Sequence, residues 1–320
     1  MERIQGASNW KLMIRREAGE ITLLRAKTCD KRAVLPDTLF DLPVTALGDH
    51  ALSPTAPEEQ GEMVEITCGP GNGDWDNQAM EELTLPKQLH RIEDYAFFNC
   101  RNLRTLNLHD DVRSWGSGVL MNCRSLSEFH IQWGTGEGEA LSYFADELSR
   151  ELDVTLDTPS GRARLIFPEY IEMFEENCAA HHFEYNIQGA GYPYHHCFRW
   201  KKFYFLDYDS LWEKYLGMDH DEDTALRLAW WRLQYPAELG EEFRLAYERY
   251  LKNHTEEALH WLLETRNASG VASLLKWAEP SRETLSAACE TAREQGNTEI
   301  LAILLETMNR RFSKKKTFDL

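Results

Sequence analysis

The sequence contains no paired cysteine motif and no long apolar run. Its seven cysteines are scattered and none forms a CxxC pair, which is typical of reduced thiols rather than of a disulfide framework. The opening residues, MERIQGASNWKLMIRRE, lack the apolar core of a signal peptide, and no other stretch is apolar over the length that a bilayer requires. We therefore expect a cytoplasmic protein that does not interact with a membrane.

Basic residues are also scarce. Lys and Arg number 35 against 53 Asp and Glu, which gives a formal net charge of -18. A protein with this excess of negative charge repels the phosphate backbone of nucleic acids, so the composition argues against nucleic-acid binding. The one basic run, KKK at residues 314–316, is expected to be a solvated tail.

The usual sequence motifs of catalysis are missing. No GxSxG, P-loop or HExxH is present, so we expect a non-catalytic protein that holds no cofactor. Residues 134–138 read GTGEG and resemble a dinucleotide-binding loop, but Glu139 follows where its carboxylate would oppose a pyrophosphate. A flexible turn at the end of the preceding strand explains the glycines better.

One cluster of metal-ligating residue types gives an alternative function. His181, His182, His195, His196 and Cys197 lie close together in the sequence. Strand alternation would place His182 on one face with His195 and Cys197, and zinc accepts these ligand types. Their spacing matches no standard zinc finger. A metal-binding protein or an enzyme centred on residues 181–197 is therefore the second hypothesis.

The residues that are abundant build a core and a repeat. Apolar residues make up 42% of the 320 residues and charged residues 28%, which is typical of a globular chain of two or three domains. Residues 83–105 and 106–128 align without a gap at an offset of 23. Leu83, Leu85, Asn99, Cys100, Arg101 and Leu103 return as Leu106, Leu108, Asn122, Cys123, Arg124 and Leu126.

Such a repeat predicts a solenoid. Each unit opens with a short LxL strand that sends both leucines inward, and stacked units bury a face that one unit cannot bury alone. Cys100 and Cys123 occupy equivalent places and should be buried thiols. A third unit begins at Phe129, and a degenerate unit is visible at 34–53. Residues 54–80, between this degenerate unit and the repeat that begins at Leu83, look like an insertion with one strand at 63–66.

The repeat resembles a known family. LPKQLHRIEDYAFFNCRNLRTLNL at residues 85–108 is similar to the BspA-type (Treponema-type) leucine-rich repeats, whose pattern is IP..V..I...AF..C..L..I.I. The resemblance covers roughly residues 34–131 and implies a curved solenoid whose concave strand face binds proteins. Trp115 and Val119 depart from the pattern. Many relatives are secreted adhesins, but this chain has no signal sequence, so we do not transfer that role.

The C-terminal part has a second repeat with helical periodicity. The segment from Thr255 overlays the segment from Leu285 at an offset of 30, with Ser281 as an expected N-cap and Gly296 as a helix stop. Asn267, Ala272, Leu274 and Leu275 return as Asn297, Ala302, Leu304 and Leu305. The pattern A..QGNTEILAILLE is similar to the second half of an ankyrin repeat, although the TPLH turn is absent. A generic helical bundle is the alternative.

The segment between the repeats is the hardest to interpret. Helices are predicted over residues 140–152 and 170–180, and strands over 154–156 and 162–167. The acidic side chains of the second helix would form a solvated face: Glu169, Glu172, Glu175 and Glu176. FPEYIEMFEEN and GAGYPYHHCF resemble segments of uncharacterised repeat proteins of gut Firmicutes, to which no activity is attached.

The sequence therefore predicts an α+β protein in three parts. Residues 1–132 form a hairpin cap, with strands at 10–14 and 21–25, and the leucine-rich repeats. Residues 133–206 cap the array and connect it to helical ankyrin-like repeats at 207–320. The expected function is binding of a protein partner, and the negative charge suggests a partner with a basic patch. Thr84, Asn107 and His130, one per strand, are the expected contacts.

Overall fold

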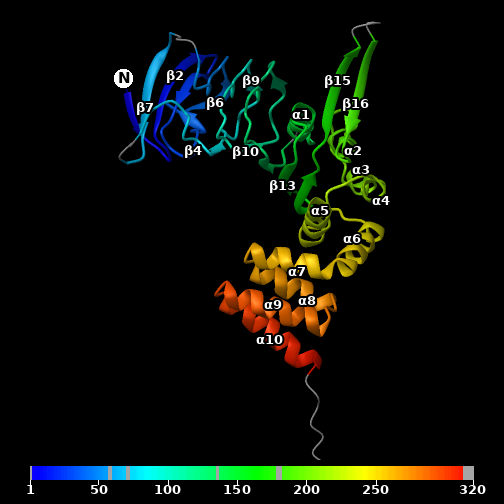
Figure 1. The fold of residues 1–320 in the computed structure, drawn as a ribbon. Coiled ribbons are helices and arrows are strands. Elements are labelled where there is room, and N and C mark those ends of the chain that lie inside the picture. The colour runs from blue at the N-terminus through cyan, green and yellow to red at the C-terminus, as the bar shows by residue number, and fades with distance from the viewer. Residues whose placement is uncertain (1, 57–59, 70–72, 135–136, 178–181, 313–320) are drawn as a thin grey trace, which may run out of the picture. The chain divides into compact units, whose positions relative to one another are not determined.

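The computed structural model describes residues 2–56, 60–69, 73–134, 137–177 and 182–312 (Figure 1). The chain divides into two compact units. The N-terminal unit comprises Met1–Thr224 with Tyr235–Leu239, and the helical unit comprises Ala225–Gln234 with Gly240–Leu320. A strand-rich solenoid followed by helices confirms the predicted α+β fold class. The boundaries expected at residues 132 and 206 stay a prediction.

Two sheets run through the N-terminal unit, and a separate two-stranded ribbon follows them. In order across sheet A the strands are β1 (Glu2–Gln5), β7 (Glu62–Thr67), β2 (Trp10–Glu17), β3 (Glu20–Lys27), β6 (Leu42–Leu47), β9 (Arg91–Ile92) and β11 (Ser114–Trp115), with β5 (Thr38–Leu39) paired to β6. Across sheet B they are β14 (Gly161–Phe167), β13 (Leu152–Thr158), β12 (Glu128–Gln132), β10 (Thr105–His109), β8 (Glu82–Thr84) and β4 (Arg32–Val34). The ribbon is β15 (Ile171–Asn177) with β16 (His182–Gln188).

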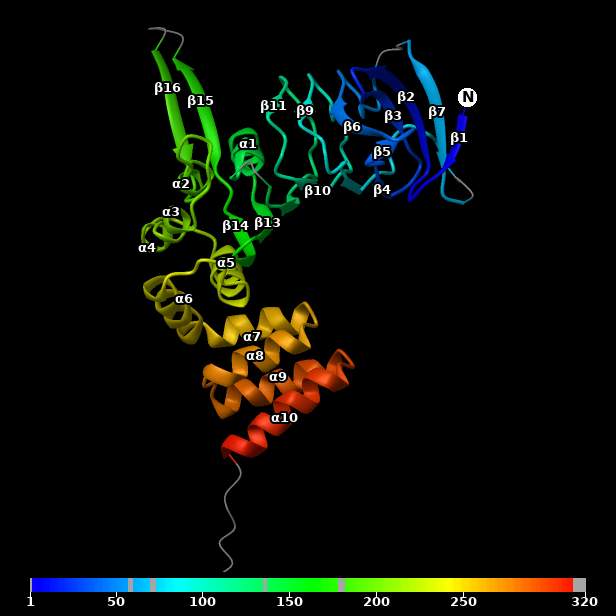
Figure 2. The ribbon, with the colours of Figure 1, turned by 180° about the vertical axis from the view of Figure 1, so that it is seen from behind.

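The predicted repeat register is confirmed in sheet B. Leu106 of β10 pairs with Leu83 of β8 on one side and with Phe129 of β12 on the other. All three side chains are fully buried, because alternation sends every second residue of each strand into the space between the two sheets. The coils that begin with β8 and β10 then return through short strands of sheet A, β9 and β11, as Figure 2 shows.

The repeated Asn-Cys pair builds the corner of each coil. Asn99 and Asn122 both have φ 64°, a left-handed conformation that asparagine tolerates better than most residues. Cys100 and Cys123 follow them, and both are buried free thiols, as predicted. Each thiol donates to a carbonyl of the preceding coil, from Cys100 to Leu52 O at 3.4 Å and from Cys123 to Phe97 O at 3.1 Å.

The front cap is also as expected. Strands β2 and β3 form a hairpin, and β3 joins β6 of the solenoid in parallel. The strand predicted inside the insertion is β7, which pairs with β2 and thereby extends sheet A. Of the insertion, residues 57–59 and 70–72 lie outside the described part.

Helix α1 (Glu139–Glu147) closes the other end of the stack, beside β11 in Figure 2. Phe144 stacks on Phe129 of the last coil with ring centroids 4.3 Å apart. The helix is shorter than predicted, because Leu152 already begins β13, which continues sheet B in parallel with β12. Strand β14 then pairs with β13 in antiparallel register, and both strands were predicted.

The helix predicted over residues 170–180 is wrong. Residues 171–177 form β15, which pairs residue by residue with β16 from Ile171↔Gln188 to Asn177↔His182. Glutamate and methionine favour a helix locally, but a partner strand that supplies a complete hydrogen-bond ladder overrides that preference. Consequently, the acidic residues of this segment do not share a helix face.

Short helices complete the N-terminal unit, and longer ones build the helical unit. The short ones are α2 (Tyr192–His195), α3 (Phe205–Asp209) and α4 (Trp212–Leu216). After α5 (Glu222–Gln234), which begins in one unit and ends in the other, come α6 (Glu241–Asn253), α7 (Thr255–Glu264), α8 (Ala268–Trp277), α9 (Arg282–Glu294) and α10 (Thr298–Phe312).

The offset-30 repeat corresponds to the pairs α7–α8 and α9–α10. Asn267 Oδ1 caps α8 by accepting from Gly270 N at 2.8 Å, and Asn297 Oδ1 accepts from Ile300 N at 3.1 Å at the equivalent place in α10. Ser281 is the N-cap of α9, as predicted, and Gly296 has φ 67° after that helix, which fits the predicted stop. The helical repeat is therefore real, whereas its ankyrin-like character stays a prediction.

Candidate partner-binding groove

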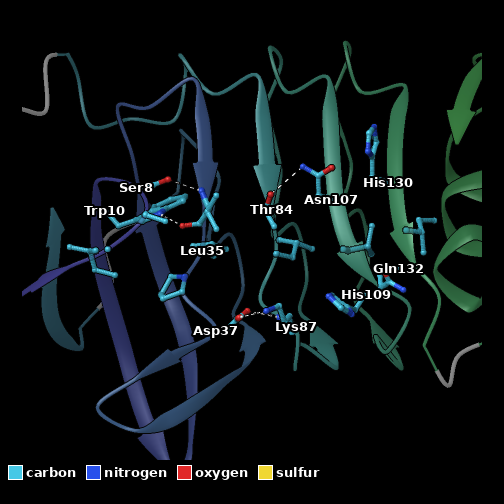
Figure 3. Close-up of a pocket in the computed structure, with 18 of the residues that line it drawn as sticks. Ser8, Trp10, Leu35, Asp37, Thr84, Lys87, Asn107, His109, His130 and Gln132 are labelled. Carbon is cyan, nitrogen blue, oxygen red and sulfur yellow. Dashed lines mark hydrogen bonds and ion pairs between the residues drawn. The ribbon is translucent and has the colours of Figure 1, made fainter. Parts of the chain in front are cut away.

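The three residues expected to contact a partner lie in one row across sheet B. Asn107 pairs in register with Thr84 of β8 and with His130 of β12, and all three side chains point to the same side of the sheet (Figure 3). The register extends the row to Val34 on β4 and to Thr155 on β13. Because the coils stack in register, residues at equivalent positions of successive coils lie side by side in one row across the sheet.

Thr84, Asn107 and His130 differ in how many hydrogen bonds their side chains already make. Asn107 Nδ2 donates to Thr84 Oγ1 at 3.1 Å and to Glu82 Oε1 at 2.9 Å, so the middle of the row is already hydrogen-bonded. His130 is exposed, and its ring makes no hydrogen bond within the described residues. The threonine hydroxyl hydrogen, the side-chain Oδ1 of Asn107 and the imidazole therefore remain available to a ligand.

A cavity of about 460 Å³, called the groove below, runs along this row. One end is mainly apolar, with Ala7, Val34 and Pro36 in its wall. The other end is polar and includes His109, Gln132 and Asp157, which form a second row two residues further along the strands. This second row was not predicted from the sequence. Its signal was present, because strand alternation places residues i and i+2 on one face.

Both edges of sheet B are occupied. At β4, Val34 N donates to Ser8 Oγ at 2.9 Å, and Trp10 Nε1 donates to Val34 O at 2.8 Å. At β14, Ala163 forms an antiparallel bridge with Pro236 of the same unit. A partner strand would need free backbone groups at an edge. Sheet B is therefore accessible mainly through its face, where the groove lies.

The charges within the groove are neutralised. Arg162 makes a two-point contact with Asp157, at 2.6 and 3.0 Å, and this hydrogen bonding lowers the pKa of the carboxyl group. Lys87 Nζ lies 3.2 Å from the Asp37 carboxylate. The groove therefore offers polar and apolar contacts rather than a strong local charge.

The N-terminal unit carries all of the negative net charge of the chain. The helical unit has 14 Lys and Arg against 13 Asp and Glu and is nearly neutral, so the excess of acidic residues behind the total of -18 belongs to the other unit. A cationic partner would be attracted to the N-terminal unit over a Debye length of about 8 Å at physiological salt.

The described members of the histidine and cysteine cluster, His195, His196 and Cys197, do not form a metal site. His195 is buried, and its ring nitrogens lie 2.9 Å from Ala145 O and 3.0 Å from Pro168 O. Burial lowers the pKa of His195 and raises the pKa of the Cys197 thiol to about 12. His181 and the side chain of His182 lie outside the described part. Among the side chains that the structure describes, no three His, Cys, Asp or Glu are placed to hold one metal ion.

The glycine-rich turn leads to a helix N-terminus that is already occupied. The Asp110 carboxylate accepts from Gly138 N at 2.7 Å and from Ala140 N at 3.0 Å at the start of α1. Two further residues of the turn, 135 and 136, lie outside the described part. Because a protein carboxylate takes these amides, they are not free to bind a pyrophosphate.

Coils that stack their strands in sheet B, with return strands in sheet A, define this part of the chain as a repeat solenoid. Residues 71–141 match the family model described as "BspA type Leucine rich repeat region (6 copies)". The chain thus contains a BspA-type leucine-rich repeat region, as its repeats indicate, and Thr84, Asn107 and His130 all lie within it. This family suggests a protein-interaction module. No curated protein and no solved structure matches the chain.

A membrane-spanning segment was not expected. Among the described residues, no helix has both the length and the apolar character needed to cross a bilayer.

Proposed function

We propose that this protein binds another protein without catalysing a reaction, and that the groove on sheet B is its binding surface. The observation that carries the proposal is the alignment of Thr84, Asn107 and His130 in register on three adjacent strands that line one cavity. Because the strands are fixed in a stacked sheet, these side chains can bind with little further loss of conformational entropy.

The partner surface is an extended segment that crosses the strands. Neighbouring strands lie about 4.8 Å apart, so such a segment meets one row residue at each strand. Its apolar side chain would fit the end near Val34, and its polar groups would fit the end near His130. The acidic N-terminal unit favours a partner with a basic patch. Since the groove charges are paired, salt should slow association more than it speeds dissociation.

The lining of the groove supports binding rather than catalysis. General acid–base catalysis needs a titratable group that is free to exchange a proton with a substrate. Asp157 and Asp37, which line the groove, are already held by Arg162 and Lys87. The histidines that remain, His109 and His130, lie on an open sheet face. A cytoplasmic location, expected from the cysteines, stays part of this proposal.

The test is affinity capture from the native host with the full-length protein, followed by mass spectrometry and a direct titration of the captured partner. Thr84→Arg/His130→Arg should lose at least about tenfold in affinity, because two bulky cations then fill the row. The matched control is Asn102→Arg/Met121→Arg, which adds the same charge at positions outside the groove. Equal binding by the wild type and the groove variant would place the binding surface elsewhere.

A further inference from the structure

The turn that follows the histidine and cysteine cluster has an unusual composition. Arg199 and Lys202 form a two-residue hairpin through reciprocal backbone hydrogen bonds of 3.0 and 2.9 Å. Its central residues, Trp200 and Lys201, have φ 54° and 65°. Positive φ at both central positions is the pattern of a type I′ turn, which strongly favours Asn-Gly. Tryptophan and lysine are therefore strained here, and neither has an evident structural benefit in the turn.

The turn also presents its tryptophan to solvent. The Trp200 side chain is 95% exposed, whereas every other tryptophan whose burial is described is buried or half-buried. Tyr204 and Leu206, 44% and 61% exposed, extend the apolar surface. A protein rarely keeps both backbone strain and an exposed indole unless the side chain has a function. Tryptophan is the residue type that most often anchors a protein interface.

The base of the turn is held on both sides. Arg199 forms an ion pair with Asp207 and lies over the Tyr204 ring, 5.5 Å from its centroid. On the other side, Lys202 forms an ion pair with Glu137, and Phe203 N donates to Glu137 O at 2.9 Å. The indole is therefore presented by a pre-organised support, which reduces the entropy that binding costs.

A cavity lies directly beside this turn. It measures about 610 Å³, and Lys201 forms part of its wall. Trp115 and Tyr143 lie in the same wall and stack with ring centroids 4.2 Å apart. Asp146 of α1 is also in the wall. Neither Asp146 nor Lys201 makes an ion pair with another described residue. The cavity thus combines an aromatic wall with an unpaired carboxylate, which suits an indole followed by a lysine.

We infer that a second copy of this chain occupies the cavity, through reciprocal insertion of Trp200 in a two-fold symmetric dimer. A two-fold interface requires one patch that is complementary to itself. This patch contains the projecting side chain, Trp200, and, directly beside it, the receiving cavity that Lys201 helps to line. In the dimer, Trp200 of each copy packs against Trp115 and Tyr143 of the other, and Lys201 pairs with Asp146 across the interface.

Replacement of the projecting Trp200 side chain gives the first test. Trp200→Asn/Lys201→Gly installs the sequence that the turn geometry prefers. Sedimentation equilibrium of the full-length protein should show a reversible wild-type dimer, and the variant should raise the dimer Kd at least about tenfold. The variant should also have a higher Tm than the wild-type protein at a concentration where both are monomeric, because turn strain is relieved. A loss of dimer through misfolding would lower Tm instead.

Charge exchange gives the second test and distinguishes contacts between copies from contacts within one copy. Lys201→Glu places two acidic residues at each contact of its homodimer, and Asp146→Lys places two basic residues there. Each single variant should dimerise more weakly than the wild type. An equimolar mixture of the two variants should form heterodimers, since each of the two contacts then joins one acidic and one basic side chain.

Two results would overturn the inference. One is a wild-type protein that remains monomeric at the highest accessible concentration, because Trp200 would then not bind a second copy of the chain. The other is a dimer that persists unchanged in Trp200→Asn/Lys201→Gly, or a mixture of the charge variants that dimerises no better than either variant alone.

Discussion

Asn122 Nδ2 donates to Asn99 Oδ1 at 3.0 Å, and Asn99 Nδ2 donates to Thr55 Oγ1, also at 3.0 Å. The two asparagines are one coil apart, and each occupies the left-handed corner of its coil. One residue type therefore serves two purposes, because it tolerates the positive φ and its side chain links successive coils. This explains why the asparagine recurs at the offset of 23.

The corner asparagine can be tested by substitution. Asn122→Ala should lower the free energy of unfolding by about 1–2 kcal/mol, because alanine is strained at positive φ and loses the hydrogen bond to Asn99. Asn122→Gly keeps the favourable φ and should cost less. Urea denaturation of the three proteins measures both effects. A glycine variant less stable than the alanine variant would contradict the role of the left-handed corner.

The stacked interior predicts a large difference between two neighbouring positions. Leu106 is fully buried between equivalent residues of adjacent coils, and Leu106→Ala should cost about 2–5 kcal/mol. Thr84→Ala, on the open face, loses only the part-buried hydrogen bond from Asn107 and should cost no more than about 1 kcal/mol. Thermal or urea unfolding of the full-length variants checks this. Similar losses at both positions would disprove the repeat register.

The cysteines should divide sharply by reactivity. Burial raises the pKa of the Cys100 thiol strongly and the pKa of Cys123 to about 12, whereas Cys68 is exposed. Thiolates are the reactive species. A thiol reagent at pH 8 should therefore label Cys68 rapidly, and should label Cys100 and Cys123 only after denaturation. Peptide mapping with Cys68→Ser as control identifies each site. Rapid native labelling of Cys100 would argue against the stacked interior.

Asp110 should give the stability of the N-terminal unit a specific pH dependence. Burial raises the pKa of this carboxyl group, although the amides of Ala140 and Gly138 partly oppose the shift. The folded protein therefore binds this proton more tightly than the unfolded chain. The contribution of Asp110 to stability is fully present below its unfolded pKa and falls as pH rises through the raised value.

Asp110→Asn removes this titration. The difference in unfolding free energy between the wild type and Asp110→Asn should therefore shrink as pH rises from about 4 to neutral. Urea denaturation at a series of pH values measures it. A difference that stays constant would show that the two amide hydrogen bonds balance the cost of burial, and a difference that grows with pH would show that they outweigh it.

The sequence alone determined the length of the coils, the direction of their leucines and the row of polar side chains on sheet B. The offset from Leu83 to Leu106 sets the coil length, and the period-2 pattern decides which leucines turn inward. Because every coil repeats the same spacing, the row of Thr84, Asn107 and His130 also follows from the sequence. Local signals were sufficient at Ser281 and Gly296, since caps and helix stops depend on nearby backbone geometry.

Only the tertiary structure decided the features that depend on distant partners. Residues 171–177 become a strand because β16 supplies their ladder, which no local propensity reveals. Ser8 and Trp10 block the edge at Val34, and Asp110 occupies the amides at Gly138, through contacts between residues 24 to 28 positions apart. The exposure of Trp200 and the cavity at Lys201 likewise arise from packing of separate segments, so they had no signal in the sequence.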